Sequence, residues 1–178
     1  LVETVLQFAS RLKAQGSRLN ILDIGTGSGN ITISLAKFLH NVKITAVDIS
    51  QEAIEVAQNN VVLNSVEEKI NFINKDFFAM CHVPCAMYQF SFDFIVSNPP
   101  YIPSEEIDKL QPEIKYEPRI ALDGGLDGLD FYRRLIAGSI KYLKKGGLLI
   151  LEMGFNQSEA LKNIFQKFED FEIIEVVK

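Results

Sequence analysis

The sequence predicts an α/β fold built on a doubly wound, mostly parallel sheet. Short apolar runs alternate with segments of helical spacing along the 178 residues, an order typical of parallel strands joined by helices. The runs are mostly apolar, as expected for strands that are covered on both faces. A hydrophobic content of 47% is enough for one globular domain with a sizeable core.

The expected elements follow one another in a regular order. Ser50 is the expected N-cap of one helix, and Asn156 with Glu159 resembles a capping box at the start of another. Ser104 is expected to cap a short helix. The other helices are expected at 1–14, 31–39, 51–63, 127–142 and 157–168, and the strands at 20–24, 42–48, 70–74, 92–97, 147–153 and 171–177.

A glycine-rich turn joins the first strand to the next helix. Gly25, Gly27 and Gly29 stand at alternate positions after an apolar run. Glycine lets the backbone approach a ligand closely, and the following helix N-terminus offers free N–H groups. The dinucleotide pattern G-x-G-x-x-G requires a glycine where this chain has Asn30, which disfavours a nicotinamide or flavin ligand. Gly-x-Gly alone often marks only a tight turn.

The tetrapeptide Asn98-Pro99-Pro100-Tyr101 directly follows the apolar run 92–97. Two adjacent prolines fix φ and remove two backbone donors, so the loop is stiff and its carbonyls have few internal partners. The side-chain oxygen of Asn98 and the carbonyl of Pro99 can then accept hydrogen bonds from one planar NH2 group, beside the aromatic face of Tyr101. Such groups are the amide of glutamine and the exocyclic amine of a base. The alternative is that Asn98 only forms a turn before proline.

Four candidate segments follow expected strand ends: residues 25–29, Asp48, Asp76 with Phe77, and residues 98–101. The carboxyl ends of parallel strands meet at one edge of a sheet, where ligands bind near the topological switch. We therefore expect one site. A carboxylate at Asp48 can accept both hydroxyls of a ribose, and its alternative is a helix N-cap or a surface acid.

Charge and composition disfavour several classes of protein. The net charge is −5, and residues 103–130 carry eight acidic and three basic side chains. A nucleic-acid enzyme is expected to have a basic footprint beside its site. The segment therefore favours a basic protein partner, unless it is only a solvated loop. No apolar run approaches the ~20 residues that span a bilayer, no signal peptide is visible, and two cysteines fit a reducing compartment.

These motifs together resemble a class I S-adenosylmethionine-dependent methyltransferase. Within that class the chain resembles the HemK/PrmC group, which methylates the glutamine amide of peptide chain release factors. The similarity extends to the segment 117–133, the segment 146–154 and Gln157. The Asn-Pro-Pro-Tyr motif is shared with base-methylating enzymes, whereas the pattern of the 117–133 segment is specific to a much narrower group of enzymes. The resemblance covers nearly all of the chain.

The resemblance implies a Rossmann-like methyltransferase fold, here without its last antiparallel strand, and S-adenosyl-L-methionine as cofactor, with S-adenosyl-L-homocysteine as product. It implies that Asp76 or the backbone beside it contacts the adenine amine and that Phe77 covers the face of the adenine ring. The alternative for Phe77 is that it is only a residue of the hydrophobic core. Asp23 is expected to hold the N–H groups of the glycine loop and to reach the methionine ammonium. The expected cofactor-binding residues are Asp23, Gly25, Thr26, Gly27, Ser28, Gly29, Asp48, Ile49, Asp76, Phe77 and Asn98.

Catalysis is expected at Asn98, Pro99 and Tyr101, and substrate contact at these residues and Pro100. If both N–H groups of a glutamine amide donate to Asn98 and Pro99, the nitrogen gains electron density and faces the methyl group. Catalysis then consists mainly of orientation and electrostatics, without a strong base. The implied substrate is the Gly-Gly-Gln motif of a release factor in translation termination. We expect no stable nucleic-acid binding, no membrane contact and a monomer in the cytoplasm, or in mitochondria if the source is eukaryotic.

Several interpretations stay open at this point. The acceptor could instead be a glutamine of a ribosomal protein or a base amine of DNA or RNA, or the chain could bind the cofactor without turnover. Residues 1–178 are expected to be a methyltransferase catalytic domain alone, without the family's N-terminal helical docking domain. Cys81, His82 and Cys85 are one ligand short of a zinc site, so no metal is expected, and residues 79–91 are expected to form a variable loop.

Overall fold

The computed structural model describes residues 1–12, 17–80, 91–112 and 114–177, which fall into two units. The first unit comprises Leu1–Asn98 and Lys141–Leu151, and the second comprises Pro99–Ile140 and Glu152–Lys178. The tetrapeptide Asn-Pro-Pro-Tyr therefore contributes its first residue to one unit and the other residues to the second. The expectation that residues 1–178 act as one catalytic domain stays a prediction.

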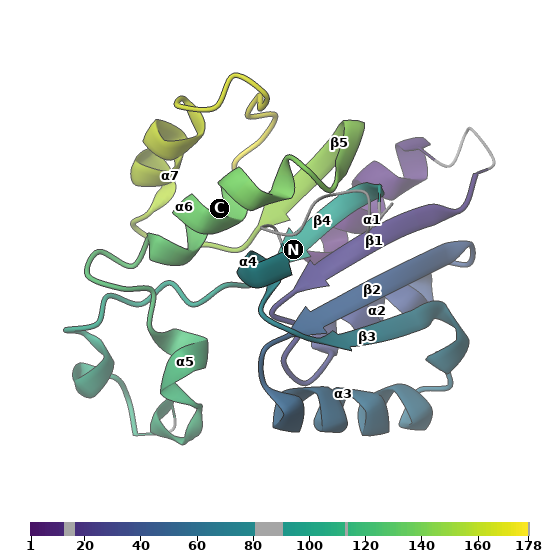
Figure 1. Ribbon diagram of the computed structural model, residues 1–178, viewed down its shortest axis with the longest axis horizontal. Helices are drawn as coiled ribbons and strands as arrows, with labels where there is room; N and C mark the ends of the chain where they lie inside the picture. Colours follow the sequence, from purple (N-terminus) through teal and green to yellow (C-terminus); the bar gives the residue numbers. More distant parts are fainter. Residues whose placement is uncertain (13–16, 81–90, 113, 178) are drawn as a thin grey trace. The chain divides into compact units, whose positions relative to one another are not determined.

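The first unit is built on a five-stranded sheet in the order β3-β2-β1-β4-β5 (Figure 1). All neighbouring strands are parallel. The chain fills one half of the sheet from β1 to β3 and then continues on the other side of β1, which is the strand order of a doubly wound fold. The predicted fold class is confirmed. The strands are β1 (Leu19–Ile24), β2 (Val42–Asp48), β3 (Ile70–Asn74), β4 (Phe92–Ser97) and β5 (Leu143–Leu151).

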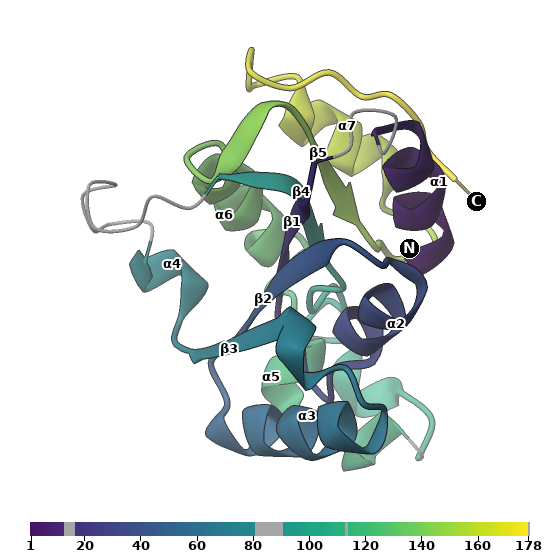
Figure 2. The same ribbon diagram turned by 90° about the vertical axis from the view of Figure 1, so that its right-hand side faces the viewer.

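Helices join the strands of this unit. They are α1 (Val2–Leu12), α2 (Asn30–Phe38), α3 (Gln51–Leu63) and the short α4 (Phe77–Met80), with a 3-10 turn, η2, at Glu67–Lys69. Figures 1 and 2 show α1 and α2 on one face of the sheet and α4 on the opposite face. Ser50 caps α3 as predicted, because its hydroxyl accepts a hydrogen bond from the N–H of Ala53 at 3.1 Å.

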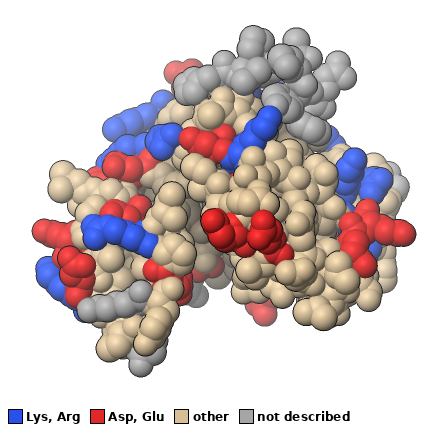
Figure 3. Space-filling view, turned by 60° about the horizontal axis from the view of Figure 1, so that its bottom comes forward, with Lys and Arg blue, Asp and Glu red and all other residues tan. Residues whose placement is uncertain are grey.

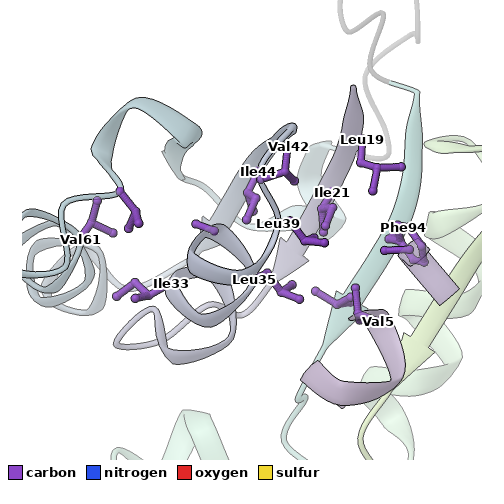
Figure 4. Close-up of a cluster of buried hydrophobic side chains, with 14 residues drawn as sticks. Val5, Leu19, Ile21, Ile33, Leu35, Leu39, Val42, Ile44, Val61 and Phe94 are labelled. Carbon is purple, nitrogen blue, oxygen red and sulfur yellow. The ribbon is translucent and has the colours of Figure 1, made fainter. Parts of the chain in front are cut away.

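The hydrophobic core of the first unit lies between the sheet and helices α1 and α2 (Figure 4). Ile21, Ile44 and Phe94 point into it from three adjacent strands, and Val5 and Leu35 fill it from the helices. All five side chains are fully buried, and burial of a side chain of this size stabilises a fold by about 1.5–3 kcal/mol. This packing fixes the strands whose carboxyl ends carry the candidate site residues.

The second unit contains short helices and turns. Its helices are α5 (Arg119–Leu122), α6 (Asp130–Ser139) and α7 (Ser158–Phe165), with 3-10 turns η4 (Ile107–Lys109) and η5 (Ile114–Tyr116). The ring of Tyr132 in α6 is fully buried, and its hydroxyl donates to the carbonyl of Glu152 at 2.7 Å. That bond joins α6 to the segment that precedes α7.

Four expectations about elements are wrong. Residues 171–177 form no strand, because no described strand pairs with them. Strand β5 begins at Leu143, ahead of the expected position 147. The N-cap of α7 is Gln157, without a side-chain cap, so Asn156 forms no capping box. Ser104 caps no helix; its hydroxyl donates to Asp123 Oδ1 at 2.6 Å.

Candidate functional site

The glycine loop after β1 is held by hydrogen bonds to the end of β2. The N–H groups of Gly25 and Thr26 both donate to the carbonyl of Val47, at 2.8 and 3.1 Å. The N–H of Gly27 donates to Asp48 Oδ2 at 2.8 Å. Gly27 has a φ of +54°, and a Cβ added there would meet nothing within 4 Å. The loop backbone therefore borders open space at Gly27, which leaves room for a ligand.

Gly29 has a different role from the two glycines before it. A Cβ at this position would meet Ala57 Cβ at 3.2 Å and Ile33 Cδ1 at 3.3 Å, and its φ is +86°. A glycine is needed here so that the loop can approach α3 closely. The side chain of Asn60 in α3 completes the contact by donating to the carbonyl of Ser28 at 3.0 Å. This end of the loop therefore packs against α3.

Asp23 lies at the end of β1 and is fully buried. Its Oδ2 accepts hydrogen bonds from the hydroxyls of Thr26, at 2.8 Å, and Thr32, at 2.6 Å. It thus holds hydroxyls, whereas the N–H groups of Gly25, Thr26 and Gly27, which the sequence predicts it to hold, donate to Val47 and Asp48. Its Oδ1 has no hydrogen-bond partner among the described residues. Burial raises the pKa of Asp23 to about 6, while the two threonine hydroxyls lower it.

Asp48 ends β2 with a half-buried carboxylate. Its Oδ2 accepts from Gly27 N at 2.8 Å, and its Oδ1 accepts from Ser50 N at 2.9 Å. An ionised carboxylate has about four acceptor positions, so two backbone bonds leave capacity for hydroxyl groups of a ligand. The position of Asp48 suits the expected ribose contact. Its hydrogen bond from Ser50 also fixes the turn that leads into α3.

Ile49 follows this carboxylate and has 54% of its surface exposed. The side-chain amide of Asn74 donates to the carbonyls of Asp48 and Ile49, at 3.1 and 3.0 Å. These two bonds fix the backbone on which Ile49 is presented. An exposed, branched apolar side chain beside the carboxylate expected to bind ribose suits contact with a flat aromatic ring.

Asp76 and Phe77 follow β3, as expected. Asp76 Oδ1 accepts from the N–H of Phe78 at 2.8 Å and so supports the start of α4. Phe77 is only 4% exposed. Its ring centroid lies 5.8 Å from that of Phe78 and 5.5 Å from that of Tyr142. This burial supports the core interpretation of Phe77, and its contact with adenine stays a prediction.

Asn98 is presented at the same sheet edge as the glycine loop. Strand β4 pairs with β1, with Val96 opposite Asp23. The buried hydroxyl of Ser97 donates to the carbonyl of Ile24 at 2.6 Å and so fastens the two strand ends together. Asn98 itself is exposed. Its amide therefore stands free for contact with another molecule, next to the strand that leads into the loop.

The rest of the tetrapeptide belongs to the second unit. Pro99 is buried, and Pro100 and Tyr101 are half-buried. The carbonyl of Tyr101 accepts a hydrogen bond from Gln157 Nε2 at 2.8 Å. The N–H of the next residue, Ile102, donates to the last carbonyl of α5 at 3.0 Å. The chain is thus fastened directly after its two prolines.

The structure therefore gathers Asp23, Asp48, Asn98 and the glycine loop at the carboxyl edge of three adjacent strands of the first unit. Asp76 follows β3, the edge strand that pairs with β2. Sequence reasoning missed three side chains that shape this edge. A polar residue inside a helix or at a strand end carries little local signal, and only the long-range contacts show the roles of Thr32, Asn60 and Asn74.

The acidic segment 103–130 is partly neutralised within the second unit. Asp123 pairs with Arg119 at 3.1 Å. Arg133 pairs with Asp127 at 2.5 Å and with Asp130 at 2.9 Å, and its hydrogen bond lowers the pKa of Asp127. Among the described residues on the face drawn in Figure 3, basic side chains lie between acidic ones and form no broad patch.

The expectation of no metal site concerns residues that are only partly described. Within the described ranges, no group of three or more His, Cys, Asp or Glu side chains is placed to hold a metal ion. Cys81, His82 and Cys85 lie outside the described residues. None of the described helices has the length and apolar character needed to cross a membrane.

The residues of the first unit fit a nucleoside-bearing cofactor such as S-adenosyl-L-methionine. The Asp48 carboxylate has free acceptor positions for ribose hydroxyls, and Ile49 offers an exposed apolar surface. The unpartnered Oδ1 of Asp23 suits a donor such as an ammonium group. The open space at Gly27 allows a ligand to approach the loop backbone.

Comparison with known proteins identifies similar chains. A curated release factor glutamine methyltransferase of Thermodesulfovibrio yellowstonii is 42% identical over 179 residues, covering 100% of this chain and 61% of the relative. One of Clostridium acetobutylicum is 40% identical over 179 residues, covering 100% and 60%. The chain thus spans only part of the length of these curated relatives. A crystal structure of ribosomal protein L11 methylase from Lactobacillus delbrueckii subsp. bulgaricus shares the fold with a TM-score of 0.58 at 22% identity, over 92% of this chain and 66% of that one.

The doubly wound parallel sheet carries a glycine loop after β1, an acid at the end of β2 and an Asn-Pro-Pro-Tyr motif after β4, which is the arrangement of the Rossmann-like methyltransferase fold. The model of the methyltransferase small domain family matches residues 5–114. The chain belongs to this family.

Proposed function

We propose that the chain is the methyltransferase domain of a release factor glutamine methyltransferase. It transfers a methyl group from S-adenosyl-L-methionine to the side-chain amide nitrogen, N5, of the glutamine in a Gly-Gly-Gln motif. The observation that carries the proposal is the exposed amide of Asn98, which follows β4 beside the strand that leads into the glycine loop. The similarity to two release factor glutamine methyltransferases, which extends over all of this chain and about 60% of each relative, supports the same substrate.

Cofactor binding uses the residues at the ends of β1 and β2. Asp48 accepts the ribose hydroxyls while it keeps its bonds to Gly27 and Ser50. Ile49 covers the adenine ring, and Asp23 Oδ1 accepts from the methionine ammonium. When bound, the cofactor supplies an electrophilic methyl group on a sulfonium.

The acceptor amide is held by Asn98. Its side-chain oxygen accepts one N–H of the substrate amide, and the carbonyl of Pro99 is the expected acceptor of the other. Two such bonds increase the electron density on a nitrogen that is otherwise delocalised into its carbonyl, and they direct its lone pair. Because the nitrogen loses a proton readily once it is methylated, these residues need no strong base beside them.

The test is mass spectrometry after incubation with isotopically labelled S-adenosyl-L-methionine. The candidates are a release factor, the same factor with its Gly-Gly-Gln glutamine changed to alanine, a ribosomal protein and a DNA oligonucleotide. We expect label only on the intact release factor, at the glutamine side chain. Faster labelling of the DNA or of the ribosomal protein would show that the substrate class is wrong. Binding of S-adenosyl-L-homocysteine without any labelled product would show a binding module.

A further inference from the structure

The side chain of Gln157 bridges three separate segments of the second unit. Its Oε1 accepts from the N–H of Gly154 at 3.0 Å, and its Nε2 donates to the carbonyls of Tyr101, at 2.8 Å, and Gly128, at 3.2 Å. A neutral carboxamide supplies one acceptor group and two donors, so a single side chain serves all three partners. The two carbonyls need donors and the N–H needs an acceptor, which fixes the orientation of the amide.

Two glycines leave the space that this amide occupies. A Cβ at Gly128 would lie 2.4 Å from the carbonyl oxygen of Tyr101 and 2.7 Å from Gln157 Nε2. A Cβ at Gly154 would lie 3.0 Å from Gln157 Oε1 and 3.3 Å from Tyr101 Cδ2. Gly128 has no room for a side chain, and a Cβ at Gly154 would require Gln157 and Tyr101 to shift by a few tenths of an ångström. The three segments are therefore shaped to bring the amide of Gln157 against Tyr101.

Tyr101 connects the proline pair to hydrogen bonds within this unit. Pro99 and Pro100 have no N–H to donate and keep only their carbonyls as acceptors, so the backbone donors beside the pair belong to its neighbours. The carbonyl of Tyr101 is held by Gln157, and the N–H of Ile102 by α5. The commitment of the Gln157 side chain to these bonds also accounts for its failure to cap α7, although it occupies the N-cap position.

We propose that Gln157 is a positioning residue for the tetrapeptide Asn98–Tyr101. By holding the carbonyl of Tyr101 it sets the peptide plane after the proline pair and the direction of the Tyr101 ring, which lies against Gly154. The effect of Gln157 on turnover rests on the proposed function, in which this tetrapeptide receives the substrate amide. Its effect on the conformational order of the tetrapeptide is independent of the proposed function.

Two substitutions separate the contributions of the amide. Gln157→Met keeps the length of the side chain and removes both donors and the acceptor, whereas Gln157→Glu keeps an acceptor for Gly154 and removes only the donors to Tyr101 and Gly128. The matched controls are Gln166→Met and Gln166→Glu, because Gln166 is an exposed residue at the other end of α7. The first readout is kcat and KM with the release factor, together with calorimetric affinity for S-adenosyl-L-homocysteine.

We expect both Gln157 variants to lower kcat by about 10- to 100-fold, the scale of a misplaced reacting group. The KM for S-adenosyl-L-methionine and the affinity for S-adenosyl-L-homocysteine should stay unchanged, since the cofactor residues lie in the first unit. The Gln166 controls should behave as the unmodified protein. A kcat that is unchanged in both Gln157 variants would overturn the proposal, and so would loss of S-adenosyl-L-homocysteine binding in both, because that would show a general role in folding.

Hydrogen–deuterium exchange of the peptide that spans residues 98–104 gives a readout without turnover. We expect faster exchange there in both Gln157 variants and not in the Gln166 controls. If the unmodified protein methylates no release factor and yet the variants exchange faster, the proposed function fails and the positioning role stands. Exchange equal to that of the unmodified protein would refute the positioning role, whatever the activity.

Discussion

The carboxylate of Asp48 accepts a hydrogen bond from the N–H of Gly27 at 2.8 Å. This contact joins the end of β2 to the glycine loop after β1, two segments that are 21 residues apart in the chain. The second oxygen of Asp48 accepts from the N–H of Ser50 just before α3. One side chain thus sets the shape of the loop and the start of a helix, at the point where a ribose is expected.

Substitution of Asp48 should therefore weaken cofactor binding. We expect Asp48→Ala to reduce the affinity for S-adenosyl-L-homocysteine by about 1–3 kcal/mol, the cost of leaving polar groups without partners. Isothermal titration calorimetry measures this, and Asp170→Ala, a change at an exposed acid, is the control. Unchanged affinity of the Asp48 variant would refute the ribose role, and NAD bound as tightly as S-adenosyl-L-homocysteine would refute the cofactor assignment.

Substitution of Asn98 should affect the rate and spare the fold. Its side chain is exposed after a strand that is fastened by Ser97, so Asn98→Ala removes little packing. We expect kcat to fall by about 10²–10³-fold, the cost of one lost transition-state hydrogen bond, with unchanged affinity for S-adenosyl-L-homocysteine. Steady-state kinetics and a thermal melt decide the matter. A variant that melts much earlier but keeps its rate per folded molecule would show that Asn98 only forms a turn.

Asp23 should make the fold less stable as the pH rises. Its pKa is raised by burial from 3.8 to about 6, so between these values the folded state keeps a proton that the unfolded state has lost. The free energy of unfolding then falls with rising pH in this window, by about 3 kcal/mol in total, and is level above it. Asp23→Asn removes this contribution.

Urea unfolding of both proteins without ligand, at several values between about pH 4 and 7, measures the effect of Asp23. The difference in unfolding free energy, unmodified protein minus Asp23→Asn, should decrease as the pH rises. Taking the difference removes the opposite slope from carboxylates with lowered pKa, such as Asp127. A difference that does not change with pH, or that increases, would contradict the raised pKa of Asp23.

Two glycines with similar backbone angles should respond differently to alanine. Gly128 has a φ of +73° and Gly146 a φ of +76°, but a Cβ would be 2.4 Å from the carbonyl oxygen of Tyr101 at Gly128 and would meet nothing within 4 Å at Gly146. We expect Gly146→Ala to cost about 1–2 kcal/mol from backbone strain. Gly128→Ala should cost about 1–3 kcal/mol more through overpacking. Denaturant unfolding compares the two, and equal losses would show that the space at Gly128 is not restricted.

Much of the sheet could be predicted from the sequence. The strands expected at 42–48, 70–74 and 92–97 have the same bounds as β2, β3 and β4. Each is a short, mostly apolar run with a clear turn after it, so the local pattern is sufficient. The cap of α3 was also predictable, because Ser50 acts on a backbone N–H three residues away. The site residues at the strand ends follow from the strands themselves.

The errors arise where a distant contact overrides the local pattern. Residues 171–177 have an apolar pattern typical of a strand, but a strand also needs a neighbour, which local sequence does not specify. Asn156 has the spacing of a capping box, yet Gln157 takes the N-cap position while its amide bonds Tyr101 and Gly128. The buried ring of Phe77 packs against Tyr142, a residue far away in the sequence.

Helix α3 is joined to both segments that are expected to bind the cofactor, the glycine loop and the end of β2. The turn before its first residue is held by Asp48, and Asn60 in its last turns donates to the carbonyl of Ser28 in the glycine loop. Local opening of α3 would therefore release both segments at once. A ligand that binds these segments only while α3 is folded stabilises the folded form of the helix. By thermodynamic linkage, such a ligand raises the free energy needed to open α3 locally. The stability of α3, measured by hydrogen exchange of its amides, is thus expected to report the occupancy of the proposed cofactor site.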